Sequence, residues 1–150
     1  MLAAVKYAER GIDAKDGGPF GALVVKDGKI IGRGWNRVIS LNDPTAHAEI
    51  IAIRDACSFV GSFSLKGSVL YSSCEPCPMC LASAYWANIE TIYYGATQDD
   101  AESIGFSDAE IYRQFVSPIG ERSLPVIQVP CPAAASLMRE WALLEDRIKY

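Results

Sequence analysis

The chain has 150 residues, of which 50% are hydrophobic and 21% are charged, so it can build the core of one domain and is not generally disordered. Its 14 basic and 18 acidic residues give a net charge of −4, which offers no general affinity for nucleic acids or anionic membranes. We therefore expect a small neutral substrate. No hydrophobic run reaches the ~18–20 residues that span a bilayer, and we expect no secretory signal.

A helix is predicted from the first residues to the glycine-rich segment 16–19, which ends it. Two β-rich hydrophobic runs follow, at 20–26 and 29–35. The dipeptide Asp27-Gly28 between them predicts a hairpin with a type I′ turn, because both turn positions require a positive φ.

Two helices are predicted to begin at a proline. Asp43 as the capping residue and Pro44 at the first helical position predict a helix that runs to about Cys57. Pro78 opens a second helix, which ends at Ala87. Hydrophobic residues surround this second helix, so we expect it to be largely buried.

The remaining segments complete an alternation of strands and helices. Strands are predicted at 68–72 and 91–95, short helices at 101–115, an edge strand at 125–129, and an amphipathic helix along Leu137–Ile148. The order predicts an α/β domain with a mixed sheet that helices cover on both faces.

The cysteines point to a metal rather than to disulfides. Their number is odd, and three of the five lie between positions 74 and 80. Such a pattern favours a metal site in a reducing compartment, so we expect a cytoplasmic location. The five are Cys57, Cys74, Cys77, Cys80 and Cys131.

His47 is the single histidine, and with Cys77 and Cys80 it provides three zinc ligands. Three protein ligands are typical of catalytic zinc, which keeps one position for water, whereas structural sites have four. Cys74 is the residue that would close a structural site, and this alternative stays open. Taken singly, His47 could be a core histidine and the two cysteines a redox pair.

Glu49 lies two residues after His47, in the sequence His-Ala-Glu. This triplet, followed by Pro-Cys-x-x-Cys, is the signature of zinc deaminases, in which zinc activates a water and the glutamate acts as acid and base. Glu49 could otherwise be an ordinary residue of a helix start. Positions i and i+2 of a helix point in directions about 200° apart around its axis. His47 and Glu49 can therefore serve one metal centre only if that centre lies at the N-terminal end of the helix.

Further stretches resemble the cytidine-deaminase-like superfamily and, within it, the small bacterial guanine deaminases. The resemblance implies a three-layer α/β/α sandwich around a five-stranded mixed sheet, as a single domain over 1–150. The matching stretches are Gly17–Ala22, Asn42–Glu49, Ser73–Leu81, Tyr85–Ala87, Gly105-Phe106 with Asp108, and Lys149-Tyr150.

The same resemblance implies the activity and the assembly. The reaction would be hydrolytic deamination of guanine to xanthine and ammonia, with one zinc per subunit held by His47, Cys77 and Cys80 and with Glu49 as the proton shuttle. The chain would form a homodimer in which the C-terminal arm, about 130–150, is exchanged between subunits.

The resemblance also assigns a substrate pocket. Phe20, Asn36 and Ala48 would line it, Asp108 would contact guanine and Tyr150 would help close it. From the residues alone, Phe20 also suits a core strand, Asn36 a turn, and Asp108 the cap of a helix. A chain end such as Tyr150 commonly frays.

Three other functions share these motifs. One is deamination of another amino-heterocycle or nucleoside, such as guanosine, cytosine or ammeline. Another is a tRNA adenosine deaminase, which the charge disfavours, because the three basic and three acidic residues of 138–150 cancel. The last is an inactive structural zinc module with four protein ligands.

Overall fold

The computed structural model describes residues 1–149, which form two compact units, 1–112 and 113–149. No helix in this range is long and hydrophobic enough to cross a membrane. The elements are α1 (Leu2–Asp13), β1 (Gly21–Lys26), β2 (Lys29–Trp35), α2 (Val38–Leu41), α3 (Ala48–Val60), β3 (Ser68–Cys74), α4 (Pro78–Trp86), β4 (Thr91–Ala96), α5 (Gln98–Ser103), α6 (Ala109–Val116), the 3₁₀ turn Ile119–Glu121 and α7 (Pro132–Ala142).

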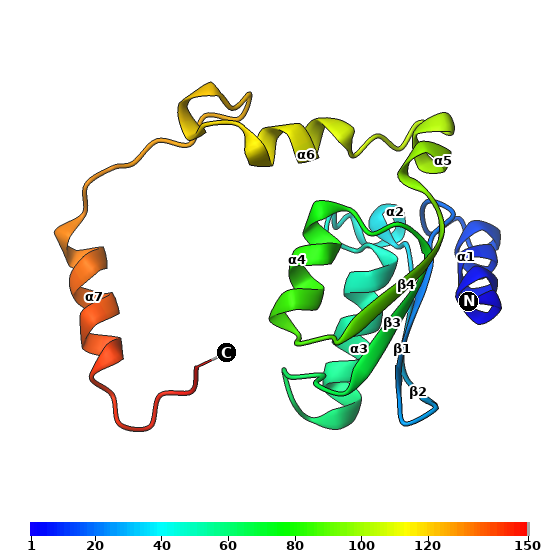
Figure 1. Ribbon diagram of the computed structural model, residues 1–150, viewed down its shortest axis with the longest axis horizontal. Helices are drawn as coiled ribbons and strands as arrows, with labels where there is room; N and C mark the ends of the chain where they lie inside the picture. Colours follow the sequence, from blue (N-terminus) through cyan, green and yellow to red (C-terminus); the bar gives the residue numbers. More distant parts are fainter. Residues whose placement is uncertain (150) are drawn as a thin grey trace. The chain divides into compact units, whose positions relative to one another are not determined.

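The first unit has three layers. Its sheet has the strand order β2-β1-β3-β4, in which β1 is antiparallel to β2 and β3, and β3 is parallel to β4. Helix α1 lies on one face of this sheet, and α3 and α4 lie on the other (Figure 1). The chain thus has the predicted α/β architecture with a mixed sheet covered on both faces.

The predicted hairpin is confirmed, because Asp27 and Gly28 both have positive φ, at 50° and 71°. A row of small residues then crosses the sheet where α3 begins, with Gly34 of β2 opposite Ala22 of β1, and Ala22 opposite Ser72 of β3. A Cβ at Gly34 would collide with the carbonyl oxygen of Ala48. The row therefore allows the first turn of α3 to lie directly against the sheet.

The predicted fifth strand is not formed, and the described sheet has four strands instead of five. Residues 125–129, predicted as an edge strand, have no regular structure. Pro125 and Pro130 lack the N–H that a ladder requires. Moreover, the described part of the second unit contains no other strand with which this segment could pair.

Helix α3 begins at Ala48, so the predicted start at Pro44 is wrong. Oδ1 of Asp43 accepts hydrogen bonds from the Thr45 N–H and hydroxyl, at 2.8 and 2.7 Å, which fixes a local turn. Aspartate commonly forms such a turn with the backbone two residues on, in competition with a helix. As a result His47, rather than Asp43, is the N-cap residue of α3.

Two further expectations about helices fail. Helix α4 is not largely buried, because only one side of it meets the core and Tyr85 and Trp86 are 77% and 65% exposed. The amphipathic pattern that continues to Ile148 does not stay helical, since α7 ends at Ala142. Hydrophobic periodicity identified both helices but not how much of each would be covered.

Candidate metal centre and substrate cavity

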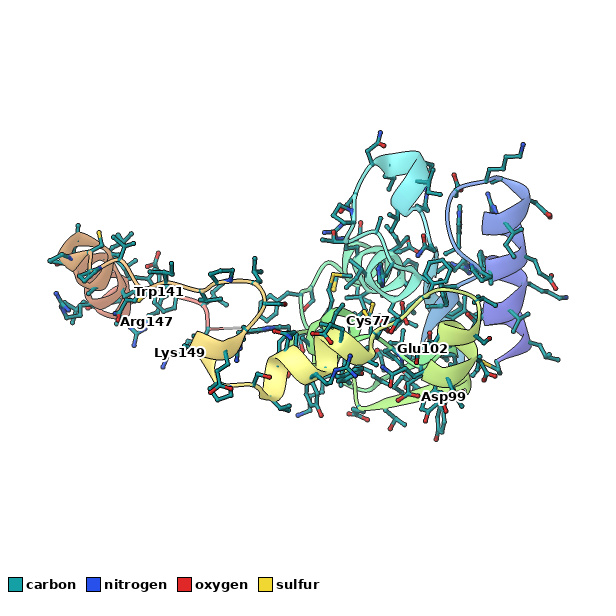
Figure 2. The ribbon with its side chains drawn as sticks, turned by 90° about the horizontal axis from the view of Figure 1, so that it is seen from above. Cys77, Asp99, Glu102, Trp141, Arg147 and Lys149 are labelled. Carbon is teal, nitrogen blue, oxygen red and sulfur yellow. The ribbon has the colours of Figure 1, made fainter. Side chains whose placement is uncertain are left out.

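Two helix N-termini bring the three metal-ligand candidates together. His47 is the N-cap residue of α3 and Cys77 that of α4, while Cys80 is the third residue of α4; Cys77 is labelled in Figure 2. Their ligand atoms all lie within 4.8 Å of one another. Nδ1 of His47 is 3.5 Å from Sγ of Cys77 and 3.6 Å from Sγ of Cys80, so Nδ1 is the nitrogen that faces the sulfurs.

The donor set fits zinc, which binds thiolates and imidazole. Hydrogen bonds from Cys80 and His47 lower the pKa of Cys77 to about 4, so its thiolate is available at neutral pH. The hydrogen bond with Cys77 and burial together raise the pKa of Cys80. The hydrogen bond with Cys77 also raises the pKa of His47.

Cys74 points away from this group. Its Sγ lies 3.5 Å from the carbonyl oxygen of Thr97, and burial raises the pKa of its thiol to about 11. In the described chain the ligand group therefore has three members, which is the number typical of a catalytic zinc site. The alternative of a structural site closed by Cys74 finds no support.

Glu49 lies beside the three metal-ligand candidates, and each of its two carboxylate oxygens has a different neighbour. The hydroxyl of Ser72 donates to Oε1 at 2.9 Å, and Oε2 lies 3.3 Å from Sγ of Cys80. Burial raises the pKa of Glu49, whose side chain is 6% exposed. His47 and Glu49 reach the same point because both lie at the N-terminal end of α3, as their spacing requires.

A cavity of about 240 Å³ opens onto this centre, entirely within the first unit. Phe20 and Phe106 form part of its wall, with an edge-to-face contact at 5.0 Å between ring centroids. A Cβ at Gly18 would lie 2.8 Å from an atom of each ring, so any other residue there would have to displace the rings. The full lining is Gly18, Phe20, Asn36, Val38, Ile39, Pro44, His47, Glu49, Cys74, Cys77, Ala101, Phe106 and Asp108.

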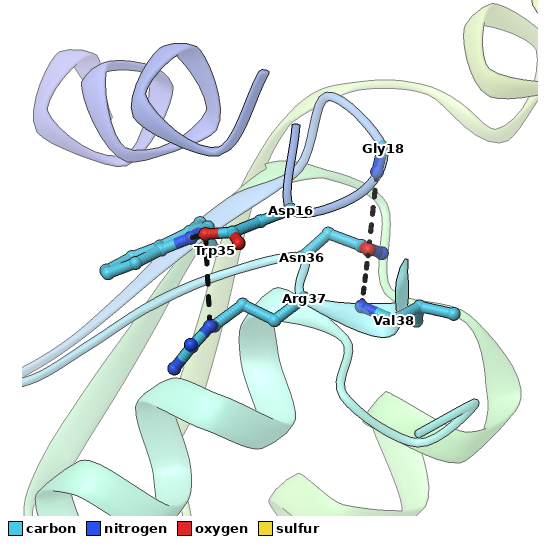
Figure 3. Close-up of polar contacts among 6 residues, drawn as sticks. All are labelled: Asp16, Gly18, Trp35, Asn36, Arg37 and Val38. Atoms are coloured by element: carbon cyan, nitrogen blue, oxygen red, sulfur yellow. Dashed lines mark hydrogen bonds and ion pairs between the residues drawn. The ribbon is translucent and has the colours of Figure 1, made fainter. Parts of the chain in front are cut away.

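Asn36 is buried in the cavity wall in a fixed orientation. Its Oδ1 accepts hydrogen bonds from the N–H groups of Gly18 and Val38, at 3.3 and 3.2 Å (Figure 3). Because the oxygen is used in this way, the amide NH₂ is the group left to meet a ligand.

A second set of contacts supports the same wall from behind. Nε1 of Trp35 donates to Oδ2 of Asp16 at 2.7 Å, and Nε of Arg37 lies 3.9 Å from the same oxygen (Figure 3). The hydrogen bond from Trp35 is the main reason that the pKa of Asp16 lies below its ordinary value. These contacts join the glycine-rich segment 16–19 to the start of α2.

Asp108 completes the polar lining on the side of α6. Burial and the nearby charge of Cys77 raise the pKa of Asp108, while the charge of His47 lowers it. The hydroxyl of Tyr112 donates to the carbonyl oxygen of Pro76 at 3.0 Å, which joins α6 to the loop before α4. The aspartate is therefore held near the metal ligands.

The structure does not bring together all the residues expected at the site. The side chain of Ala48 is fully buried in the core and does not line the cavity. Tyr150 lies outside the described residues. Sequence reasoning missed Ser72, whose one signal was a polar residue on the inward face of a strand.

Comparison with known proteins identifies the family. Residues 1–96 match the family model described as the cytidine and deoxycytidylate deaminase zinc-binding region. The chain belongs to this family of zinc-binding deaminases. Zinc is the cofactor of the family, and His47, Cys77 and Cys80 are positioned as a zinc site.

Individual relatives extend the similarity beyond residue 96. The chain is 46% identical to a guanine deaminase of Bacillus subtilis (strain 168), over 100% of this chain and 96% of that protein. A crystal structure of guanine deaminase from Bacillus subtilis covers 99% of this chain and 95% of the other, with a TM-score of 0.96 at 45% identity. A tRNA-specific adenosine deaminase of Agrobacterium fabrum (strain C58 / ATCC 33970) is 48% identical over 63% of this chain and 61% of that protein.

Proposed function

We propose that this zinc-dependent deaminase converts guanine and water into xanthine and ammonia. The observation that carries the proposal is one cavity that joins three zinc-ligand candidates, a buried glutamate and a wall with aromatic, amide and carboxylate groups. Similarity to guanine deaminase along the whole chain supports guanine over the other bases.

The roles of the metal ligands follow from their placement. His47 would bind zinc through Nδ1, and Cys77 and Cys80 through their thiolates. Zinc bound in this way would lower the pKa of a coordinated water from ~15.7 to about 7 and so supply hydroxide near neutral pH.

Glu49 would carry the protons of the reaction. A C2–O bond forms to the attacking water and the bond from C2 to the amino nitrogen breaks. Glu49 accepts one proton from the water and passes it to the ring, then takes the second proton from the hydroxyl group formed at C2 and gives it to the leaving amine, which departs as ammonia. Its buried position keeps bulk water away from these transfers.

The cavity wall offers groups that suit a free purine base. Phe20 can stack against the ring, the NH₂ of Asn36 can donate to a ring acceptor, and Asp108 can accept from a ring N–H. The cavity is smaller than the roughly 300–1,000 Å³ of pockets for drug-sized ligands, which favours a base over a nucleoside. Tyr150 would help to close the pocket.

We also propose a homodimer in which the arm of about 130–150 is exchanged between two copies. Each unit, taken by itself, leaves large hydrophobic residues uncovered. In the first unit these include Tyr85 and Trp86, and in the second Leu137, Met138 and Trp141; Trp141 is labelled in Figure 2. Aromatic and methionine side chains are enriched in protein interfaces. A cytoplasmic location is part of the proposal, because all five cysteines are free thiols.

The test is release of ammonia from a panel of substrates. Zinc-loaded protein is incubated with guanine, guanosine, adenine, cytosine, ammeline and a tRNA with adenosine at the wobble position. We expect ammonia and xanthine from guanine, with a much larger kcat/KM than for any other member. Turnover of the tRNA alone would favour the adenosine deaminase that also shares this family, and turnover of none would overturn the proposal.

A further inference from the structure

Ser72 has no part in the reaction as derived so far, yet it is the closest hydrogen-bond partner of Glu49. It lies on β3 with its side chain on the face that α3 covers, and its exposed fraction is 1%. Its hydroxyl donates to Oε1 of Glu49 at 2.9 Å. A buried carboxylate oxygen without a donor costs free energy, so this contact strongly favours the observed rotamer of Glu49.

The contact depends on how closely α3 approaches the sheet. Ser72 ends the row of small residues that begins with Gly34 and passes through Ala22. Since Gly34 has no Cβ, the first turn of α3 lies directly on that row. Glu49, the second residue of α3, therefore reaches β3 at Ser72.

The two oxygens of Glu49 consequently have different surroundings. Oε1 is held by the hydroxyl of β3, whereas Oε2 lies 3.3 Å from Sγ of Cys80, on the side of the metal ligands. We propose that Ser72 is a positioning residue that anchors Oε1 of Glu49 and so reserves Oε2 for proton transfer. This inference rests on the role proposed for Glu49 in deamination.

Loss of the anchor affects turnover more than binding. Without the hydroxyl of Ser72, the carboxyl group of Glu49 can rotate about its last torsion, so Oε2 is less often in place when a proton moves. Partners that orient a metal site commonly change activity by about 10–100-fold. We expect Ser72→Ala to lower kcat by that factor, with KM changed less than twofold, because Glu49 is not among the groups that hold the base.

The chain offers a matched control in Ser68, four residues earlier on β3. Ser68 lies on the same face of the sheet and is fully buried. Unlike Ser72, its hydroxyl has no hydrogen-bond partner in the described chain. Ser68→Ala thus removes one buried hydroxyl from the same strand without touching Glu49.

The experiment compares kcat, KM, bound zinc and melting temperature in the wild type and in Ser72→Ala, Ser72→Thr, Ser72→Cys and Ser68→Ala. Ser72→Thr keeps the hydroxyl and should keep most of kcat, whereas the weakly donating thiol of Ser72→Cys should lie between threonine and alanine. Ser68→Ala should match the wild type. If Ser72→Ala does not fold, the order of the threonine and cysteine variants decides.

A second readout does not depend on turnover. The infrared band of the Glu49 carboxyl group, assigned by subtracting the spectrum of Glu49→Gln, should shift in Ser72→Ala and stay in place in Ser68→Ala. An unshifted band, or an equal loss of kcat in both alanine variants, would overturn the inference. A wild type inactive on guanine but with the expected shift would refute the proposed substrate and leave the anchoring of Glu49 supported.

Discussion

The two units of the chain use similar hydrophobic residues in opposite ways. In residues 1–112, they form a core between the sheet and α3, with Val24 and Leu70 fully buried. In residues 113–149, no residue is buried, although Leu137 and Trp141 belong to a clear amphipathic helix. A hydrophobic pattern therefore defines a helix in both units, but its burial requires a second surface, which only the first unit supplies from its own chain.

The largest effect should come from the chemistry of the first unit. We expect Glu49→Gln to lower kcat by about 10²–10⁴-fold, because the amide cannot accept and return a proton. Bound zinc and melting temperature should stay close to the wild type. The same change at the exposed Glu9 of α1 serves as the control. Near-normal turnover of Glu49→Gln would remove Glu49 from the proposed mechanism.

The next largest effect should come from removal of zinc, which should lower the stability of the first unit and not that of the second. Chelation should destabilise the first unit by ~4 kcal/mol relative to protein with free zinc at 1,000 times its Kd, measured by thermal unfolding. Because Cys77 and Cys80 bind as thiolates, affinity falls as the pH falls, so mild acid should release the metal sooner than neutral buffer. A melting temperature that stays the same when the chelator is added would contradict the proposed zinc site.

Core truncation tests the difference in burial directly. Leu70→Ala should cost about 2–5 kcal/mol of unfolding free energy at any protein concentration, because it opens a cavity in the core. Leu137→Ala should cost less than about 0.5 kcal/mol in dilute monomer and more as dimer forms. Chemical denaturation over a range of protein concentrations measures both. A concentration-independent loss for Leu137→Ala would mean that the chain covers this residue itself.

The smallest effect concerns helix caps. Helix α5 has a capping box, in which the N–H of Thr97 donates to the carboxylate of Asp100 and the Thr97 hydroxyl accepts from the Asp100 N–H. Thr97→Ala should cost about 1 kcal/mol. The bonds from Thr97 lower the pKa of Asp100, so this stabilisation is present near neutral pH and is lost as the pH falls through the lowered pKa. Thr97→Ala removes the hydroxyl but keeps the main-chain N–H, so the difference between the two melting temperatures should become smaller in acid without vanishing, because the bond from the Asp100 N–H to the Thr97 hydroxyl does not depend on pH.

Much of the first unit could be predicted because its signals are local. The Asp27-Gly28 turn, the strands beside it and the ligand spacing of Cys77 and Cys80 each depend on a few neighbouring residues. The start of α3 was predicted wrongly because Asp43 suits both a helix cap and a turn, and only the bond to Thr45 decides between them.

The features that sequence reasoning missed are non-local. The bond between Ser72 and Glu49 joins residues 23 positions apart and depends on the register of β1 with β2 and β3. The fifth strand was expected from the family resemblance and from the hydrophobic segment 125–129, and the burial of α4 from the hydrophobic residues around the helix. The hydrophobic periodicity of a segment predicts its secondary structure, but it does not predict which other surface covers the hydrophobic face or whether any does.

The two proposed zinc ligands at helix starts carry a cost in stability for the protein itself. His47 and Cys77 make no side-chain capping bond, although serine or aspartate at such a position commonly adds about 1 kcal/mol. Selection for a more stable fold would thus favour replacing two residues that the proposed chemistry requires. Stability and activity thus favour different residues at the same two positions, so stabilising substitutions in this enzyme are better sought away from both helix starts.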